Sequence, residues 1–537
     1  MSLMGSLYVG TSGLQTSQNA LHTTAHNMSN IDTVGFTRQQ VQQGTRFYNT
    51  ISKSASAISY QQVGLGVNYT QVKQVRDYFL DKAYRREAGR SAFYEESVAT
   101  LEEVEDLFQE LQGKSFSSAI ENLWVSVQEL AKSPGDSVNQ GVFIQRCGEF
   151  IDRAKAVYKG LSEYQDNLNN KIAQQVDVIN AYGERIVELN QQILKIEAGR
   201  IEHANDLRDE RNLLLDELSS LCNIDYYEDI DGNVIVQIEG NDFVKMDSYN
   251  EIALLADDVT GFYTPYWKCL ADSSKDPVDI SRAKVFDMTQ EISTEGNTDI
   301  GALKSMLYAR GDHRATYEDL KDSATYNRDI KQSVIMNVQA EFDQLIHEVV
   351  KGINQIFEDA ANNASAKWPG TDYLRDSNGD PYKIFNTVSG ITDANGDPMY
   401  TLSNIIINDE LKQAPSLLGL FRPDEKEDQE VADALKELFT KELYTLNPNT
   451  ETKLALIKYY DNLVSQVADT GSVLKGICAN QETTAENLAA AREQILGVSS
   501  DEELSNMIMF QNAYNAASRY INVVNEMLEH IISTLGR

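Results

Sequence analysis

The apolar residues near the end of the chain alternate strictly in steps of three and four. They are Met507, Phe510, Tyr514, Ala517, Ile521, Val524, Leu528, Ile531 and Leu535, and the polar Gln511 stands beside them. This heptad spacing is that of a helix that buries one narrow seam against another helix. Such a helix is marginal alone in water, because most helical stability comes from packing. We therefore predict a long C-terminal helix that needs a partner.

The start of this helix is predicted from its polar residues. Ser500 precedes Glu503 by three positions, which is the spacing of a capping box. Asp501 and Glu502 would also be favoured by the positive end of the helix dipole. Few charges follow Leu504, so the outer face of the helix is poor in ions.

A second seam lies at the other end of the chain. Apolar residues recur once in every seven positions, at Leu7, Leu14, Leu21 and Met28. Asp32 is the one formal charge between Met1 and Thr37, and the polar positions hold Ser, Thr, Gln and Asn. Uncharged polar groups can be buried through hydrogen bonds without desolvating ions. We expect this helix to be surrounded by other segments.

Both ends of the chain thus carry a helix that lacks a partner in its own neighbourhood. We expect the two helices to pair with each other and then with copies from neighbouring subunits. An ordinary intramolecular pair fits the periodicity equally well. The fold class predicted is mainly α, with coiled-coil-like terminal helices, an elongated helical bundle and β-rich inserted domains.

The middle of the chain alternates between helical and β-rich stretches. Apolar residues from Leu168 to Ile196 step by threes and fours, and "VGLGVNYTQVKQV" reads as strands or a hairpin punctuated by Gly64 and Gly66. β character is expected from residue 223 to about Thr294. The predicted units are residues 1–50 with 500–537 (inner helices), 51–222 with 300–361 and 450–499 (bundle), 223–299 (β-rich insertion) and 362–449 (turn-rich α/β insertion).

Composition excludes several classes of partner. The 537 residues carry a net charge of −34, which repels phosphate backbones and anionic lipid, so we expect no nucleic acid partner. No apolar run reaches the length of a membrane span, so we expect no membrane insertion. The four cysteines, Cys147, Cys222, Cys269 and Cys478, are too scattered for a zinc site or a disulfide framework.

No catalytic, cofactor-binding or metal site is predicted. "HTTAH" places His22 and His26 four residues apart, but Thr23 stands where a metalloprotease needs Glu. The stretches "DIDGN", "DSNGDP" and "DANGDP" are similar to calcium loops but lack the Gly and Glu of an EF-hand, and tight turns explain them. The chain is therefore predicted not to be an enzyme.

Three phrases carry a resemblance to a known family. "NMSNIDTVGFTRQQV" resembles the N-terminal signature of bacterial flagellar axial proteins, a family of rod, hook and hook-associated proteins. The matching positions are Asn27, Asn30, Thr33, Gly35, Phe36 and Arg38. "GLGVNYTQVKQVRDYFLDKAYRRE" and "GVSSDEELSNMIMFQNAYNAASRYINVVNEML" are similar to later parts of the same family, and "TRQ" is similar to the first of the hook–filament junction proteins. Val34 departs from the family, where many members have Pro.

The resemblance implies a structural role and a set of partners. Family members are exported unfolded through the flagellar type III apparatus, without a cleaved signal, to an extracellular place in the flagellum. The implied partners are copies of the chain in a ring, the hook protein, the second junction protein (hook-associated protein 3) and a cytoplasmic export chaperone that binds the C-terminal seam. The phrase from Asn27 to Phe36 is expected to be a reversal in which Gly35 stops the helix.

Three other functions remain open from the sequence. A rod or hook subunit would share the terminal signatures. A secreted enzyme would carry chemistry between residues 223 and 450, where no ligand cluster is found. A cytoplasmic coiled-coil scaffold would leave the uncharged helix faces unexplained.

Overall fold

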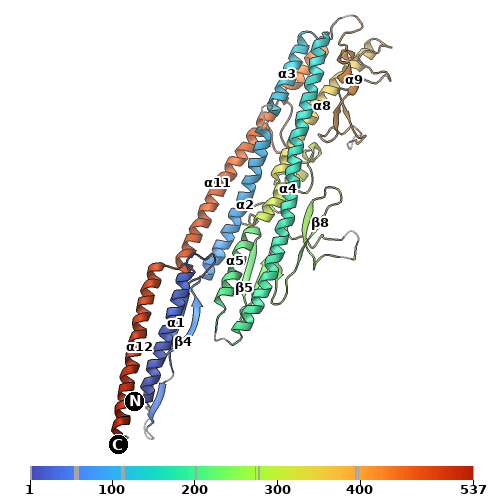
Figure 1. Cartoon of the computed structure of the whole chain (residues 1–537). Helices are drawn as coiled ribbons and strands as arrows, with labels where there is room; N and C mark the ends of the chain where they lie inside the picture. The colour runs from blue at the N-terminus through green and yellow to red at the C-terminus, as the bar shows by residue number, and fades with distance from the viewer. Residues whose placement is uncertain are drawn as a thin grey trace.

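The chain folds into an elongated molecule with both termini at one end (Figure 1). The computed structural model describes residues 3–46, 48–53, 60–109, 115–199, 202–272, 274–275, 278–392, 396, 398–424 and 426–535. A terminal unit occupies one end, and a long helical bundle with two lateral insertions occupies the rest. In the part of the chain described, no helix is both long and apolar enough to cross a bilayer.

The terminal unit combines the first and last helices with four strands. Helix α1 (Leu3–Ser29) packs against α12 (Ser500–Leu535) in antiparallel fashion (Figure 1). Strand β1 (Gln39–Thr45) pairs with β4 (Val67–Gln74), and β2 (Tyr48–Lys53) pairs with β3 (Tyr60–Gly64), all antiparallel. Both terminal helices were predicted, and both form.

The strands around Gly64 and Gly66 differ from the simple expectation. These two glycines do not form a hairpin turn, because β3 and β4 run on in the same arm and pair with β2 and β1. The strand pairs also cross residue 50, where the inner unit was predicted to end. Residues 60–74 therefore lie with the terminal unit, and the remaining domain limits stay predictions.

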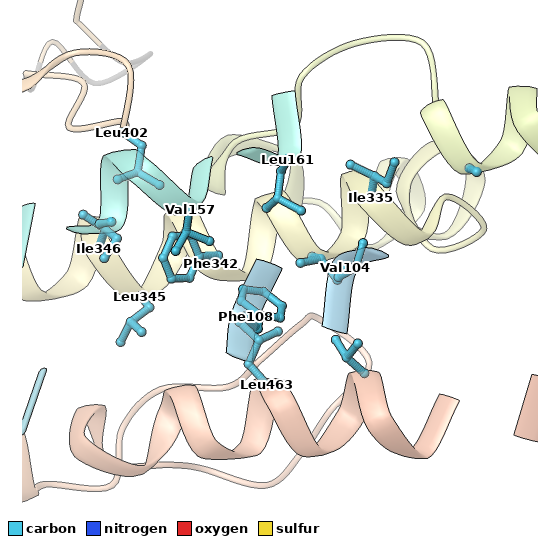
Figure 2. Close-up of a cluster of buried hydrophobic side chains, with 14 of the residues drawn as sticks. Val104, Phe108, Val157, Leu161, Ile335, Phe342, Leu345, Ile346, Leu402 and Leu463 are labelled. Atoms are coloured by element: carbon cyan, nitrogen blue, oxygen red, sulfur yellow. The ribbon is translucent and has the colours of Figure 1, made fainter. Parts of the chain in front are cut away.

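Helices from most of the described chain build the bundle. They are α2 (Tyr78–Gln109), α3 (Phe116–Lys132), α4 (Ser137–Glu197), α5 (Asn205–Leu221), α6 (Ala302–Arg310), α8 (Val334–Lys367) and α11 (Leu456–Leu496). Figure 2 shows how segments far apart in sequence meet: Phe108 of α2 and Leu161 of α4 lie beside Phe342 of α8 and Leu463 of α11. Close packing of these large side chains makes the bundle one body.

The predicted heptad seam of the long middle helix lies in α4. Leu168, Ile172, Ile179, Ile186, Leu189 and Ile193 are fully buried. Ile196, the last predicted member, is 46% exposed because α4 ends one residue later, at Glu197. Both buried cysteines, Cys147 and Cys222, belong to the bundle core and are free thiols.

The first insertion is a set of short antiparallel strands on the side of the bundle. Strands β5 (Ile224–Glu228), β6 (Val234–Ile238) and β7 (Asn241–Val244) form one sheet, and β8 (Ile252–Ala256) pairs with β9 (Tyr263–Trp267). Strand structure was expected to continue to Thr294. The last strand of the insertion ends at Trp267, and between Trp267 and Thr294 the described residues form only isolated bridges.

Short elements complete the molecule. Tyr317–Leu320 forms 3-10 helix η1, Ser323–Thr325 forms α7 and Tyr326–Ile330 forms π-helix η2. The second insertion contains β10 (Phe385–Thr387), β11 (Ile405–Ile407), α9 (Asp409–Gln413), η3 (Pro415–Leu418) and α10 (Gln429–Thr440). Asp229 and Asp376 cap tight turns with their carboxylates, while most of "DANGDP" lies outside the described residues.

Candidate assembly interface

Two glycines of α1 face α12 directly. A Cβ added to Gly10 would lie 2.7 Å from Ile521 Cγ1 and 3.1 Å from a ring carbon of Tyr520. A Cβ on Gly13 would lie 3.6 Å from Ala517 Cβ, which is ordinary van der Waals contact. Small residues let two helix backbones come close and place the larger side chains of one helix directly on the other. At Gly10 there is therefore no space for a side chain between the two helices.

The face of α1 that is buried most deeply is polar. Ser12, Thr16, Ser17 and Thr24 are each at most 7% exposed. Thr16 Oγ1 donates to the Ser12 carbonyl at 2.9 Å and Ser17 Oγ to the Gly13 carbonyl at 2.8 Å, so these hydroxyls are satisfied within the helix. Buried polar groups cost little once they are hydrogen-bonded. This is how a helix with so few ions is enclosed on two sides.

Ser12 also ties α1 to the strands. The backbone N–H of Val67 donates to Ser12 Oγ at 3.2 Å. The preceding Gly66 has φ +92°, and a Cβ there would lie 2.1 Å from that same oxygen. Only glycine fits this conformation and this contact, so Gly66 serves the approach of β4 to α1 and not a hairpin.

The predicted seam residues lie along the terminal pair with unequal burial. Leu7, Leu14, Leu21 and Met28 are all half-buried. In α12, Val524 is buried; Met507, Phe510, Tyr514, Ala517, Ile521 and Leu528 are half-buried; and Gln511 and Ile531 are exposed. The side chain of Leu535 lies outside the described residues. The pair thus covers its seam only partly within one chain.

A second heptad stripe on α12 is open to solvent. It comprises Met509, Ala513, Ala516, Tyr520, Val523 and Met527, which again alternate in steps of four and three. Met509 is 54% exposed, Val523 47% and Met527 52%. This outer stripe was not predicted, because alanines fill two of its positions. Its spacing is the signal that could have revealed it.

The predicted signature residues form the loop that joins α1 to β1. Asn27 is 1% exposed, and its side chain donates to the Gln39 carbonyl at 2.8 Å and accepts from the Gln39 N–H at 3.0 Å. Asn30 Nδ2 donates to the His26 carbonyl at 3.0 Å, and Thr33 Oγ1 donates to Asn30 Oδ1 at 3.1 Å. The two asparagines therefore close the end of α1 and hold the first strand against it.

Gly35 does not end α1 as expected but lies in a turn six residues beyond the end of the helix. Helix α1 ends at Ser29, so Gly35 does not stop it. Instead, the N–H of Phe36 donates to the Thr33 carbonyl at 3.2 Å, and Gly35 has φ +79° while Val34 does not have positive φ. These features define a type II turn with Val34 and Gly35 at its centre. Type II turns favour Pro at the first central position, which explains why Pro suits the place of Val34.

Arg38 connects this loop to the start of α12. Its Nε donates to Glu503 Oε1 at 2.8 Å, its Nη1 lies 2.9 Å from Glu502 Oε2, and its backbone N–H donates to the Leu496 carbonyl at 2.9 Å. The capping box predicted for Ser500 and Glu503 is wrong. The Glu503 side chain binds Arg38 instead, and its backbone N–H donates to the Ser499 carbonyl at 3.0 Å.

A network of alternating arginine and aspartate side chains holds the bundle together next to the Arg38 contacts. Asp81 Oδ1 accepts from Arg492 Nε at 2.7 Å, and Arg492 Nη2 donates to Asp216 Oδ2 at 2.6 Å. Arg85 Nε reaches the other oxygen of Asp216, also at 2.6 Å, and Arg76 pairs with Asp81. Arg76 lies in the linker between β4 and α2, and the other residues come from α2, α5 and α11, so this network holds those helices beside the terminal unit. Burial and shared partners make such networks sensitive to removal of one member.

Asp209 of α5 completes the joint. Its carboxylate accepts from the Thr37 N–H at 3.2 Å and from Gln74 Nε2 at 2.7 Å, so it holds both the signature loop and the end of β4. Burial raises the pKa of Asp209 to about 6, against the lowering effect of the Thr37 hydrogen bonds. Gln39 Nε2 donates to the neighbouring Asp206 at 3.2 Å. These contacts join residues far apart in the chain and could not be predicted from local sequence patterns.

The histidines near this loop serve packing. The ring of His26 meets Phe36 edge-on with centroids 5.5 Å apart, and its Nε2 lies 3.5 Å from Asp206. His22 is exposed on α1. Within the described residues, no group of three or more His, Cys, Asp or Glu side chains is arranged to hold a metal ion.

The comparisons with known proteins agree along the length of the chain. Residues 101–364 match the model of the flagellar hook-associated protein FlgK helical domain. Residues 7–37 match that of the flagella basal body rod protein, and residues 494–534 match that of the flagellar basal body rod FlgEFG protein C-terminal region.

Whole-chain relatives carry one name. Flagellar hook-associated protein 1 of Bacillus subtilis is 25% identical over 529 residues, covering 97% of this chain and 96% of that protein. The Escherichia coli protein of the same name is 22% identical, covering 97% and 98%. The fold resembles that of the flagellar hook junction protein FlgK from Burkholderia pseudomallei, with a TM-score of 0.54 and 12% identity over 79% of this chain and 100% of that one. Along nearly its whole length, the chain is therefore similar to flagellar hook-associated protein 1.

Proposed function

We propose that this chain is a structural subunit of the bacterial flagellum, placed where the hook joins the filament, and that it assembles through α1 and α12. The observation that carries the proposal is the terminal pair itself. It gathers the axial-protein signature, a seam covered only partly within one chain, and a second apolar stripe with heptad spacing that faces solvent.

The outer stripe favours copies of the same chain as neighbours. A heptad stripe presented to water is normally covered by another helix. Exposed methionines and a tyrosine along such a stripe are side chains that adapt to a helical partner and bury a large apolar area. A ring of subunits would bring α12 of one copy beside the terminal helices of the next. The hook protein and hook-associated protein 3 are the neighbours we propose on either side of that ring.

Export precedes assembly in this proposal. We propose secretion in an unfolded state through the flagellar type III apparatus, with a cytoplasmic chaperone on the C-terminal seam. Two properties support this: the apolar stripes of α12 need cover before assembly, and the four cysteines are free thiols. A chain without disulfide links can pass a narrow channel in extended form. The final location is the flagellum, outside the cell.

The test separates folding from assembly. Met509→Glu combined with Met527→Glu places two charges on the outer stripe and leaves the α1 contacts in place. Asn512→Glu adds a charge on an exposed polar position of the same helix and is the matched control. Each variant replaces the native chain in a motile cell. We expect the control to swim and the double variant to make hooks without filaments, while the purified double variant keeps the circular dichroism and proteolytic pattern of the native monomer.

A second variant probes the inner seam. Ile521→Asp puts a carboxylate beside Gly10, which separates α1 from α12 within the chain. We expect loss of assembly together with rapid proteolysis of both terminal helices, while the bundle survives. Normal filaments from cells that carry either the stripe variant or Ile521→Asp would rule out assembly through these helices.

A further inference from the structure

A cavity of about 390 Å³ lies where the terminal unit meets the bundle and the first insertion. Its walls include Lys73 and Arg76 from the end of β4 and the linker after it, Asp81 from α2, Arg208 from α5, and Tyr226 and Glu228 from β5. Three parts of the molecule therefore contribute side chains to one space. The cavity is distinct from the helix pair through which the chain is proposed to assemble.

The charge of this cavity is opposite in sign to that of the chain. Three cationic side chains face it against two carboxylates, whereas the whole chain has a net charge of −34. Both carboxylates are already engaged. Asp81 accepts from Arg492 at 2.7 Å and pairs with Arg76, and Glu228 Oε1 lies 2.8 Å from Arg208 Nη1. Lys73 is the wall cation nearest to solvent.

Two donors in the wall have no acceptor in the described structure. They are the hydroxyl of Tyr226, a residue only 6% exposed, and Nη2 of Arg76. Two guanidinium nitrogens close by are in the same condition, Nε of Arg211 and Nη1 of Arg85, on residues that are 1% and 2% exposed. A buried donor without a partner is costly, and native proteins leave few of them. Four near one cavity point to a missing acceptor.

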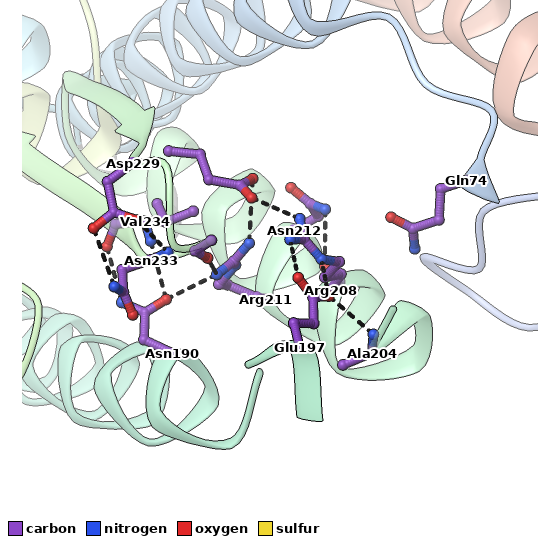
Figure 3. Close-up of polar contacts among 12 residues, drawn as sticks. Gln74, Asn190, Glu197, Ala204, Arg208, Arg211, Asn212, Asp229, Asn233 and Val234 are labelled. Atoms are coloured by element: carbon purple, nitrogen blue, oxygen red, sulfur yellow. Dashed lines mark hydrogen bonds and ion pairs between the residues drawn. The ribbon is translucent and has the colours of Figure 1, made fainter. Parts of the chain in front are cut away.

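The surrounding contacts hold these donors in place. The Arg85 guanidinium stacks over the Tyr226 ring at 4.5 Å from its centroid. Arg211 Nη1 donates to Asn190 Oδ1 at 2.9 Å and to the Gly232 carbonyl at 2.7 Å, and Arg208 makes a two-point contact with Glu197, as Figure 3 shows. Burial lowers the pKa of Arg211 to about 10; the charges of Glu228 and Glu197 oppose this shift, and those of Arg208 and Arg76 add to it. The surrounding side chains are thus fixed by contacts of their own, while the Tyr226 hydroxyl and Arg76 Nη2 lack acceptors.

We propose that this cavity binds a tetrahedral oxyanion of the phosphate class, held by Arg76, Tyr226 and Lys73. Such an ion offers acceptor oxygens in several directions; sulfate carries no donor, and hydrogen phosphate carries one O–H beside three other oxygens that accept. Guanidinium groups bind it through charge-assisted hydrogen bonds. A water molecule matches less well, since it brings two donors into walls whose carboxylates are already occupied. The bound ion would link β4 to α5 and β5 and stiffen the joint.

Calorimetric titration of the intact monomer tests the site. Inorganic phosphate, and sulfate in parallel, are titrated into protein in a phosphate-free buffer, with sodium chloride at equal ionic strength as the reference. We expect saturable binding of one ion per chain. Tyr226→Phe removes one donor and keeps the ring, and Arg76→Gln removes the charge; each should weaken phosphate binding by about tenfold or more. Arg146→Gln makes the same change on exposed α4 surface and should bind like the native chain.

A second readout guards against a merely misfolded variant. In chloride alone, Tyr226→Phe should unfold at the native temperature or above it, because it removes a buried hydroxyl that has no partner. In phosphate, the native chain and Arg146→Gln should gain thermal stability, and Tyr226→Phe should gain much less. Absence of saturable heat with both anions overturns the site. Equal affinity of the native chain, Tyr226→Phe and Arg76→Gln overturns it as well, since the ion then binds elsewhere.

Discussion

Arg38 and Glu503 stand 465 positions apart in the chain, and their side chains meet at 2.8 Å. The Glu503 side chain is 3% exposed and that of Arg38 25%. The pair joins the family signature to the first turn of α12, directly beside the carbonyl of Leu496 that receives the Arg38 backbone N–H. One arginine therefore fixes the angle at which the C-terminal helix leaves the bundle.

Removing one side of this pair should loosen the start of α12. Arg38→Ala leaves the buried Glu503 carboxylate without its charged donor, which costs about 1.5–3 kcal/mol in the stability of the terminal unit. Hydrogen exchange of the backbone amides from residue 500 onward measures the change, and exchange in the bundle should not alter. Glu502→Gln is the control. Glu502 also contacts Arg38, but its side chain is 62% exposed, so this substitution should change the stability of the terminal unit very little. Equal effects of Glu502→Gln and Glu503→Gln would contradict this.

The two glycines of α1 make opposite predictions. Gly13→Ala adds a methyl group at ordinary contact distance, so the helix propensity of alanine should stabilise the terminal unit by up to about 1 kcal/mol. Gly10→Ala places its methyl group 2.7 Å from Ile521 Cγ1, and we expect overpacking to cost about 1–3 kcal/mol relative to Gly13→Ala. Proteolytic susceptibility of α1 in the two purified monomers checks the order. If Gly10→Ala proved the more resistant, the close helix approach would be refuted.

The turn at Val34 and Gly35 should accept proline at one position and reject alanine at the next. Val34 is 81% exposed and occupies the first central place of a type II turn, so Val34→Pro should stabilise the fold by about 0.4–1 kcal/mol through the unfolded chain. Gly35→Ala must keep φ +79° and approach Leu213 to 3.3 Å, so it should destabilise by about 1 kcal/mol or more. Thermal unfolding of both variants is the measurement. A fall in melting temperature for Val34→Pro would exclude the type II turn.

A buried carboxyl in α8 should make stability depend on pH. Glu341 is fully buried, and burial raises its pKa to about 7 despite hydrogen bonds from Asn447 and Gln466. Its folded pKa thus lies above the ordinary value, so its contribution is complete below about pH 4.5 and is lost as pH rises to about 7. The free energy of unfolding of the native chain, relative to Glu341→Gln, should fall by about 1–3 kcal/mol between pH 5 and pH 8. Urea unfolding at both values measures it.

The control for this pH effect is Glu163→Gln, on the exposed surface of α4. It should show no such change between pH 5 and pH 8. Asp343, two residues after Glu341, is also buried with its pKa raised to about 7, so Glu341→Gln removes only part of the dependence. A constant difference between the native chain and Glu341→Gln at both pH values would mean that Glu341 is ionised in the folded chain throughout.

Local periodicity made the helices predictable, and long-range contacts decided the rest. The seams of α4 and α12 depend on side chains three or four positions apart and that of α1 on side chains seven apart, so these helices could be predicted from local periodicity. Glu503 was misread because its partner, Arg38, comes from the other end of the chain. Gly66 was read as a turn residue because nothing local shows that Ser12 Oγ lies against it.

Some residues of the candidate assembly interface could likewise be predicted from the sequence, and others could not. The signature residues from Asn27 to Arg38 could be named from the sequence because their order along the chain is the signal. The residues that receive them, Asp209 and Glu503, carry no motif and were found only in the structure. The outer stripe of α12 lies between these cases: its spacing is local, but its exposure depends on which face α1 covers.

The terminal unit can form only in a chain that contains both α1 and α12, the first and the last helix. Neither helix can find the other until every residue between them has been made, and closing so long a loop places this contact late in folding. A chain that stops early can still build much of its bundle, but its α1 has no α12 to cover it and its Arg38 has no Glu503. Incomplete chains therefore lack the joining surface altogether. Only a complete chain can therefore form the helix pair through which the subunit is proposed to assemble.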